Sequence, residues 1–177
     1  MAGFCVEAKV KEIPVRGGLM ALVDDEDEAL VSGYNWHALQ RSWSRASYAR
    51  AYIPGSHPKR QVLMHRLILN APDRVDVDHE DRDGMNNRRY NIRLATKSQN
   101  LHNAEKHRTH NGRAPTSRFK GVCRYLRPRG RKGWDARVSV DGGRKYLGTF
   151  LTEREAALAY NSFAKNHFGP FARLNNV

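Results

Sequence analysis

The last third of the chain places the tightest limits on the fold. From 134 to 140 apolar and polar residues alternate, which predicts a strand with one buried face. Asp141-Gly142-Gly143 then predicts a tight hairpin turn into a second strand. Thr152 and Glu155 have the spacing of a capping box, and apolar residues recur behind them at helical intervals until Gly169-Pro170. The pattern predicts a small antiparallel sheet packed on one helix.

The charge of the chain limits what it can bind. Its 31 Lys and Arg against 18 Asp and Glu give a net charge of +13, and residues 106–145 alone hold 13 basic and two acidic side chains. An excess of this size favours a polyanionic partner, because neutralising phosphates releases counterions. Since 40% of the residues are hydrophobic, the chain can also build cores, and it is not merely a disordered basic tail.

Composition also excludes several classes of protein. No apolar run approaches the roughly 20 residues of a membrane-spanning helix, and the first residues lack the pattern of a signal peptide. Cys5 and Cys123 alone cannot build a disulfide framework or a four-cysteine zinc site. We therefore expect a soluble, cytoplasmic protein without a membrane partner.

Composition and periodicity divide the chain into three segments and a linker. Residues 1–63 predict short strands broken by glycine and proline turns, with a short helix or turn through the acidic run 24–28. Residues 64–104 carry a dense polar pattern, 105–117 form a basic linker, and 118–177 form the sheet-and-helix unit. The first segment either supports the polar pattern or contacts the nucleic acid itself, and the sequence leaves both open.

The polar pattern contains groups suited to phosphodiester hydrolysis, which needs a base for water and a cation at the phosphate. Asp78 offers a hard oxygen ligand for Mg²⁺ or Mn²⁺. The adjacent His79 has a side-chain pKa near neutrality and can accept a proton. Thr96 can cap a helix, which would put Asn100 in its first turns as a second oxygen ligand.

These acids have two other interpretations. Asp81-Arg82-Asp83-Gly84 has some likeness to a calcium loop, but a twelve-residue loop would begin at His79 and end at Tyr90, which are the wrong residue types. Alternatively, the stretch is a purely structural loop, in which Asp83-Gly84 forms a hairpin turn and Asp78-His79 pair with neighbours. The residues alone favour the hydrolytic interpretation over both.

The stretch 75–103 resembles the HNH endonuclease family. The family's motifs occur here in order, as Asp78-His79, Asp83-Gly84, Asn86-Asn87-Arg88, Asn91-Ile92-Arg93 and Ser98-Gln99-Asn100. The resemblance implies a ββα-metal module, with a hairpin from about 75 to 94 and a helix from about 97. It implies that Asp78 and Asn100 hold the cation. It also implies that His79 is the general base, and that Asn91 orients His79 and the loop.

Two features qualify this resemblance. Asn100 stands where some members have a third histidine, which implies the asparagine variant found in homing enzymes of group I introns. His65, Arg66 and Arg93 are weaker site candidates. They contact phosphates or serve local packing, and the sequence leaves both open.

Residues 118–177 resemble the DNA-binding domain of the plant ethylene-response-factor (APETALA-like) family, which also occurs in bacterial and phage endonucleases. The matching blocks are 119–122, 134–138, 146–150, 156–160 and 169–175. The resemblance implies a three-stranded antiparallel sheet laid in the major groove of double-stranded DNA, with one helix behind. Cys123 and Ser139 stand where plant members carry DNA-contacting arginine, so the plant recognition sequence cannot be transferred.

The resemblance also implies where DNA is contacted. Together with two neighbouring arginines, the predicted contacts are Lys120, Arg124, Tyr125, Arg127, Arg137, Arg144 and Tyr146. Arginine can fork onto guanine or phosphate, and aromatic rings can pack against sugars or thymine methyl groups. Arg127 opens an insertion, 127–132, that lengthens the first hairpin and predicts extra phosphate contact.

Together these segments predict an α+β protein: a β-rich N-terminal segment, a ββα-metal nuclease module, and a three-stranded antiparallel sheet packed on one helix. The predicted function is a metal-dependent, site-preferring DNA endonuclease of homing type, encoded by a bacterium or phage. With one site per chain it nicks as a monomer, or cuts both strands as a dimer assembled on DNA. The alternative is a DNA-binding regulator with an inactive nuclease module. A protein that binds or cuts RNA is a third option.

Overall fold

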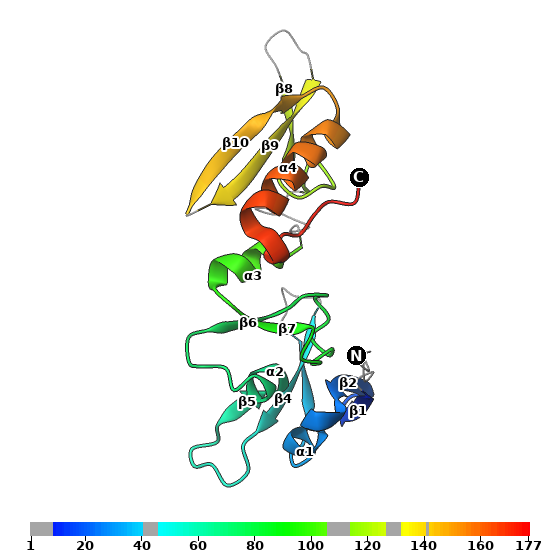
Figure 1. Ribbon diagram of the computed structural model, residues 1–177, viewed down its shortest axis with the longest axis vertical. Helices are drawn as coiled ribbons and strands as arrows, with labels where there is room; N and C mark the ends of the chain where they lie inside the picture. Colours follow the sequence, from blue (N-terminus) through cyan, green and yellow to red (C-terminus); the bar gives the residue numbers. More distant parts are fainter. Residues whose placement is uncertain (1–8, 41–45, 106–113, 127–131, 141) are drawn as a thin grey trace, which may run out of the picture. The chain divides into compact units, whose positions relative to one another are not determined.

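The computed structural model describes residues 9–40, 46–105, 114–126, 132–140 and 142–177. The chain folds into two compact units, residues 1–97 and 98–177. The first unit combines several small antiparallel sheets with short helices, and the second combines one antiparallel sheet with helices, so the fold is mixed α and β (Figure 1). The division falls inside the predicted segment 64–104, and the predicted domain limits stay predictions. None of the helices in the described ranges is long and apolar enough to span a membrane.

The first unit is built from short strands and helices. In chain order they are β1 (Val10–Val15), β2 (Leu19–Asp24), η1 (Asp25–Asp27), α1 (Glu28–Val31), β3 (His37–Gln40), β4 (Ser47–Tyr52), β5 (Gln61–Leu63), α2 (Met64–Ile68), β6 (Asp76–His79) and β7 (Ile92–Ala95). Strands β1–β2 and β6–β7 form antiparallel pairs, and β3, β4 and β5 form a three-stranded sheet in that order. The expected strands near the N-terminus and the short helix through the acidic run are confirmed.

One apolar core holds the first unit together. β2 contributes Val23, β4 contributes Ala49 and Ala51, and α2 contributes Met64, all of which are almost fully buried. Burying one large apolar side chain stabilises a fold by about 1.5–3 kcal/mol. The core therefore fixes β4 and α2 beside the β6–β7 hairpin, whose Ile92 joins the same cluster.

The N-terminal strands also hold the loop between β6 and β7. The amide of Leu22 in β2 donates to the carbonyl of Met85 at 2.8 Å, and the amide of Asn87 donates to the carbonyl of Leu22 at 2.7 Å. At Gly84, a Cβ would lie 2.4 Å from the carbonyl oxygen of Ser47, so only glycine allows this approach to β4. Of the two roles left open for the N-terminal segment, support of this loop is the one the contacts show.

The second unit is a sheet covered by a helix. Its elements are α3 (Lys97–Asn103), which begins on the last residue of the first unit, β8 (Val122–Leu126), β9 (Lys132–Val140), β10 (Gly143–Phe150), α4 (Glu153–Phe168) and η3 (Gly169–Phe171). The sheet has the antiparallel order β10–β9–β8, and α4 runs across one face of it (Figure 1). Ala136 and Val138 of β9 face α4 and are buried, as the alternation predicts.

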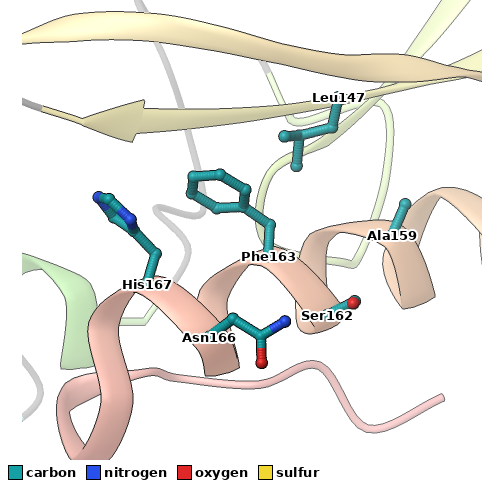
Figure 2. A pocket seen from close by; sticks show the side chains of 6 residues that line it. All are labelled: Leu147, Ala159, Ser162, Phe163, Asn166 and His167. Carbon is teal, nitrogen blue, oxygen red and sulfur yellow. The ribbon is translucent and has the colours of Figure 1, made fainter.

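The helix α4 starts and packs as expected. The Thr152 hydroxyl accepts the amide of Glu155 at 3.2 Å, and the Glu155 carboxylate accepts the amide of Thr152 at 3.1 Å, which confirms the capping box. A shallow hollow between β10 and α4 is lined by Leu147, Ala159, Ser162, Phe163, Asn166 and His167 (Figure 2). It contains none of the predicted site residues.

Candidate functional site

Asp78 lies in β6, one residue before the end of the strand, and it is only 4% exposed. Directly opposite it in the ladder is Arg93, whose Nε and Nη2 donate to Asp78 Oδ2 at 3.0 and 2.8 Å. Arg93 also pairs with Glu80 through Nη1 at 3.1 Å. A buried carboxylate needs such a partner, because its desolvation would otherwise be very unfavourable. Arg93 thus supplies the positive charge beside Asp78.

His79, the last residue of β6, is 5% exposed. Its Nε2 lies 3.4 Å from Oδ1 of Asn87, and the Nδ2 of Asn87 donates to the carbonyl of Met85 at 3.0 Å. The carbonyl fixes the orientation of the Asn87 amide, so its oxygen faces the imidazole. This assigns the proton of neutral His79 to Nε2 and makes Nδ1 the basic nitrogen.

Burial lowers the pKa of the His79 imidazole, although the hydrogen bond with Asn87 and the nearby carboxylates of Asp81, Asp78 and Asp83 act in the opposite direction. Neutral imidazole is therefore the favoured form near pH 7. That is the form a general base must have before it takes a proton.

Two aromatic rings from other elements pack against His79. His65, from α2, is 5% exposed, and its ring lies edge-on at a centroid distance of 4.9 Å from the ring of His79. Tyr48, from β4, lies 5.6 Å from His65 and 5.7 Å from His79. These two rings restrict the orientation of the His79 imidazole.

Asn91 anchors the loop that follows β6. Its side-chain Nδ2 donates to the Asp81 carboxylate at 2.9 Å and to the carbonyl of Asn86 at 2.7 Å, and its Oδ1 accepts the amide of Asp81 at 3.0 Å. Partial burial alone would raise the pKa of Asp81, but the hydrogen bonds from Asn86, the Asp83 amide and Asn91 lower it overall. Asn91 thus holds the loop, and the amide oxygen beside His79 Nε2 belongs to Asn87.

The acidic run at 24–28 holds the far end of the same loop. Arg89 donates from Nε and Nη2 to the two oxygens of Asp27 at 2.9 and 2.7 Å, and its amide donates to Asp24 at 2.7 Å. Asp27 is 2% exposed, so this fork satisfies a buried charge. The pair, chiefly through the Asp27 hydrogen bonds, raises the pKa of Arg89. The acidic run is therefore a structural clamp on the loop.

Arg66, on α2, binds backbone carbonyls. Its guanidinium donates to the carbonyls of Val75, Ala71 and Pro72 at 2.6, 3.2 and 2.8 Å. Three carbonyl partners on the segment that leads into β6 fit the local-packing alternative considered for this residue.

Asn100 lies in α3, in the second unit. The C-terminal end of α3 is held there by Lys120, whose Nζ donates to the carbonyls of Leu101, His102 and Ala104 at 3.1, 2.7 and 2.7 Å. The ring of His102 also stacks on Phe168 at 3.5 Å. A cation at the end of a helix satisfies carbonyls that lack intrahelical partners. Lys120 is a predicted DNA contact, and in this structure its ammonium caps α3.

Four of the predicted DNA contacts share the sheet face opposite α4. In the β-ladders Tyr146 pairs with Arg137, Arg144 pairs with Ser139, and Tyr125 pairs with Gly133, so their side chains point the same way. Arg137 donates to Asp135 at 2.8 Å, and chiefly through this hydrogen bond the pKa of Arg137 is raised.

The other predicted contacts are placed differently. Arg124 pairs with Trp134 in the ladder, and its guanidinium lies 5.8 Å from the Trp134 ring, on the face that packs toward α4. Arg127 lies outside the described residues. The exposed face therefore carries Tyr125, Arg137, Arg144 and Tyr146.

The donor chemistry at Asp78 fits a divalent cation of the Mg²⁺ type. Within the described ranges, no group of three or more His, Cys, Asp and Glu side chains gathers in one place. Mg²⁺ does not require such a cage, because it is commonly bound by one or two protein oxygens, water and substrate phosphates. A zinc site, which needs three or four ligands from His, Cys, Asp and Glu side chains, fits less well.

Sequence reasoning missed several residues of this site. Asn87 was part of a recognised motif, but its place beside the imidazole depends on the turn that brings residue 87 back toward β6. Tyr48 carries no local signal, because it meets His79 only through packing between distant elements. The fork between Asp27 and Arg89 joins residues 62 positions apart, which no sequence pattern indicates.

Comparison with known proteins gives partial matches. The chain is 29% identical over 166 residues to an uncharacterised HNH endonuclease of Acanthamoeba polyphaga mimivirus, covering 90% of this chain and 76% of the viral protein. The chain is weakly similar to an HNH endonuclease. Its identity to an ethylene-responsive transcription factor of Arabidopsis thaliana is 34% over 110 residues, 53% of this chain and 33% of the factor.

A further partial match covers a shorter part of the chain. Dehydration-responsive element-binding protein 2C of Arabidopsis thaliana is 48% identical over 59 residues, 31% of this chain and 17% of the plant protein. The chain thus spans a third or less of these plant relatives. No family model and no solved structure matches it.

Proposed function

We propose that the chain is a metal-dependent, site-preferring DNA endonuclease of the HNH type. The observation that carries the proposal is the buried Asp78–His79 pair, in which burial favours a neutral imidazole and the Asn87 oxygen beside Nε2 leaves Nδ1 as the basic nitrogen. The similarity to a viral HNH endonuclease across 90% of the chain supports the same function. Double-stranded DNA is the proposed partner, because the relatives are by name an endonuclease, a transcription factor and a responsive-element-binding protein, and the chain carries a charge of +13.

In the proposed reaction, His79 Nδ1 takes a proton from water as the water oxygen bonds to phosphorus. The bond from phosphorus to the leaving oxygen breaks, and that oxygen is protonated from solvent. Asp78 and Asn100 would hold a Mg²⁺ or Mn²⁺ ion, which supplies positive charge to the phosphate and the leaving oxygen. Tyr48 and His65 keep the imidazole in position, and Asn91 and Arg89 keep the loop in place. The exposed sheet face supplies affinity and register on the DNA.

Plasmid nicking tests this proposal. Wild-type protein with Mg²⁺ or Mn²⁺ should convert supercoiled DNA to nicked or linear form, and His79→Ala should lower the rate by about 10²–10⁴-fold, as expected for loss of a general base. His167→Ala, which changes an exposed histidine on α4, is the matched control and should keep the full rate.

Binding must be measured alongside cleavage. If wild type and His79→Ala are equally inert with either metal while both bind DNA, the alternative of a DNA-binding regulator holds and the enzyme proposal fails. The ratio of linear to nicked product against protein concentration separates a nicking monomer from a dimer assembled on DNA.

A further inference from the structure

One face of β4 has a residue at one end that contacts the candidate catalytic histidine, His79. Ala49 and Ala51 point into the core, so Tyr48, Arg50 and Tyr52 point to the opposite side of the strand. Tyr48 already contacts the His79 ring at 5.7 Å. The same face therefore leads outward from the site through Arg50 to Tyr52.

At its outer end this face forms a basic platform around an exposed ring, which we call the β4 face (Arg50, Tyr52, Lys59 and Gln61). Tyr52 is 45% exposed. The Arg50 guanidinium and the Lys59 ammonium each lie 5.9 Å from the centre of its ring. Gln61 accepts from Arg50 at 3.5 Å and donates to the Tyr52 hydroxyl at 3.3 Å.

The segment that contains the β4 face carries charge of one sign. Residues 29–72 contain six Lys and Arg and no Asp or Glu. Elsewhere in the same unit Lys11, Arg89 and Arg93 are neutralised by carboxylates. Among the described residues, no carboxylate forms an ion pair with Arg50 or Lys59. Such a surface is complementary to phosphate.

The ring of Tyr52 also borders a hollow. Asn35, His37, Lys59 and the turn at 53–57 line the rest of it. Its volume of about 400 Å³ is large enough for a sugar or a base. An exposed aromatic ring beside cations is the arrangement on which nucleic-acid bases and sugars pack.

We propose that the β4 face binds the DNA strand that leads to His79, with Arg50 and Lys59 on phosphates and Tyr52 against a sugar or base. This inference rests on the proposed function, because the DNA path is assumed to lead to the cleavage site at His79. A strand rises about 3.3 Å per residue, so Tyr52 lies about 13 Å along β4 from Tyr48. A DNA strand advances about 3.4 Å per nucleotide, which places the contact about four nucleotides from the cut.

Site-specific crosslinking tests the contact directly. A benzophenone amino acid in place of Tyr52, in full-length protein with EDTA and a labelled mixed-sequence duplex, should crosslink to DNA on irradiation. The matched control is Leu30 of α1 in the same unit, which is 43% exposed against 45% for Tyr52, but lies next to the acidic run. A crosslink at 52 that exceeds the one at 30 by about tenfold supports the inference, and equal yields overturn it.

Charge removal tests the same surface through affinity. In EDTA, the double variant Arg50→Gln with Lys59→Gln should reduce the slope of log affinity against log salt by about 1.8, since each lost phosphate contact removes about 0.9. The control, Lys9→Gln with Arg154→Gln, also removes two exposed charges and should change the slope by much less. Equal changes in both variants would contradict a contact at the β4 face.

Nicking separates this inference from the proposed function. With metal, Arg50→Gln with Lys59→Gln should raise KM about tenfold and leave kcat within about twofold, as for loss of a contact made equally before and during reaction. If wild type does not nick while position 52 crosslinks, the proposed enzyme fails and the DNA contact stands. If wild type nicks and position 52 does not crosslink, the DNA path lies elsewhere.

Discussion

The residues proposed for chemistry in the first unit are buried, whereas those proposed for DNA contact in the second unit are exposed. Asp78, His79 and Asn91 are each 5% exposed or less, while Tyr146 is 56% exposed and the Arg137 side chain 47%. Burial orients the first set and shifts the pKa of His79. Exposure leaves the second set able to reach a partner. The difference means that substitutions in the first set should disturb folding and rate, and substitutions on the exposed face should disturb chiefly affinity.

One position in the second unit should affect stability strongly, although this unit carries the exposed face. Gly121 has φ +73°, and a Cβ there would lie 2.1 Å from the ring of Tyr160, beneath the sheet. Gly121→Ala combines a strained backbone with overpacking and should destabilise the protein by about 3–5 kcal/mol. Chemical denaturation followed by tryptophan fluorescence measures this.

Gly142→Ala is the matched control for this prediction. Gly142 has a similar φ of +76°, but nothing lies within 4 Å of a Cβ there. Only the backbone term remains, so the loss should be about 1–2 kcal/mol. Equal losses at positions 121 and 142 would mean that the close approach to Tyr160 does not matter.

In the first unit, Asn91→Ala should have the next largest effect. It removes one of the partners of the Asp81 carboxylate and the side-chain partners of the Asp81 amide and of the carbonyl of the buried Asn86. An unsatisfied buried polar group destabilises by about 1–3 kcal/mol. We expect a total loss of about 2–4 kcal/mol and slower nicking, because the loop beside His79 loosens. Asn166→Ala, at an exposed site on α4, should change stability by less than about 0.5 kcal/mol. An Asn91 variant as stable as wild type would show that the loop is held by other contacts.

Local elements of both units were predictable from sequence, but the contacts that complete the site were not. The alternation at 134–140 and the capping box at Thr152 depend on nearest neighbours, and both are confirmed. The packing of Tyr48 on His79 and the fork from Arg89 to Asp27 depend on which distant elements meet. Charge pattern alone also misleads, because the acidic run, the most charged part of the first unit, forms part of the scaffold.

On the exposed face, Arg137→Ala should lower affinity, and it should also lower stability somewhat because the buried Asp135 carboxylate loses its arginine partner. If Arg137 forks onto a guanine, its loss should weaken binding to the preferred site by about 1–3 kcal/mol, or about 5–150-fold, and weaken binding to mixed sequence much less. Arg154→Ala, which removes the same charge from α4 on the other side of the sheet, is the control. Fluorescence anisotropy on both kinds of duplex measures the two losses. Equal losses on both would make Arg137 a phosphate contact that does not select sequence.

The smallest expected effect is a change of stability with pH that comes from the buried His79. Because burial lowers the pKa of His79, the unfolded chain binds a proton more readily than the folded protein below the ordinary histidine value of about 6.5. Stability should therefore be fully present above that pH and fall as the pH drops below it, by at most about 1.4 kcal/mol per unit for one proton. The lowered pKa of Asp81 acts in the same direction, but only near and below the ordinary aspartate value of about 3.9. Between pH 7 and 5 the two groups are thus separable.

Denaturation of wild type and His79→Gln in EDTA at pH 7 and pH 5 isolates the histidine. The wild type should lose more stability than the variant between these values, because glutamine does not titrate. The exposed His167→Gln should follow the wild-type slope. If His79→Gln loses as much stability as wild type, the imidazole is not held in its neutral form by burial. The contrast between a buried chemical site and an exposed binding face would then lose its electrostatic basis.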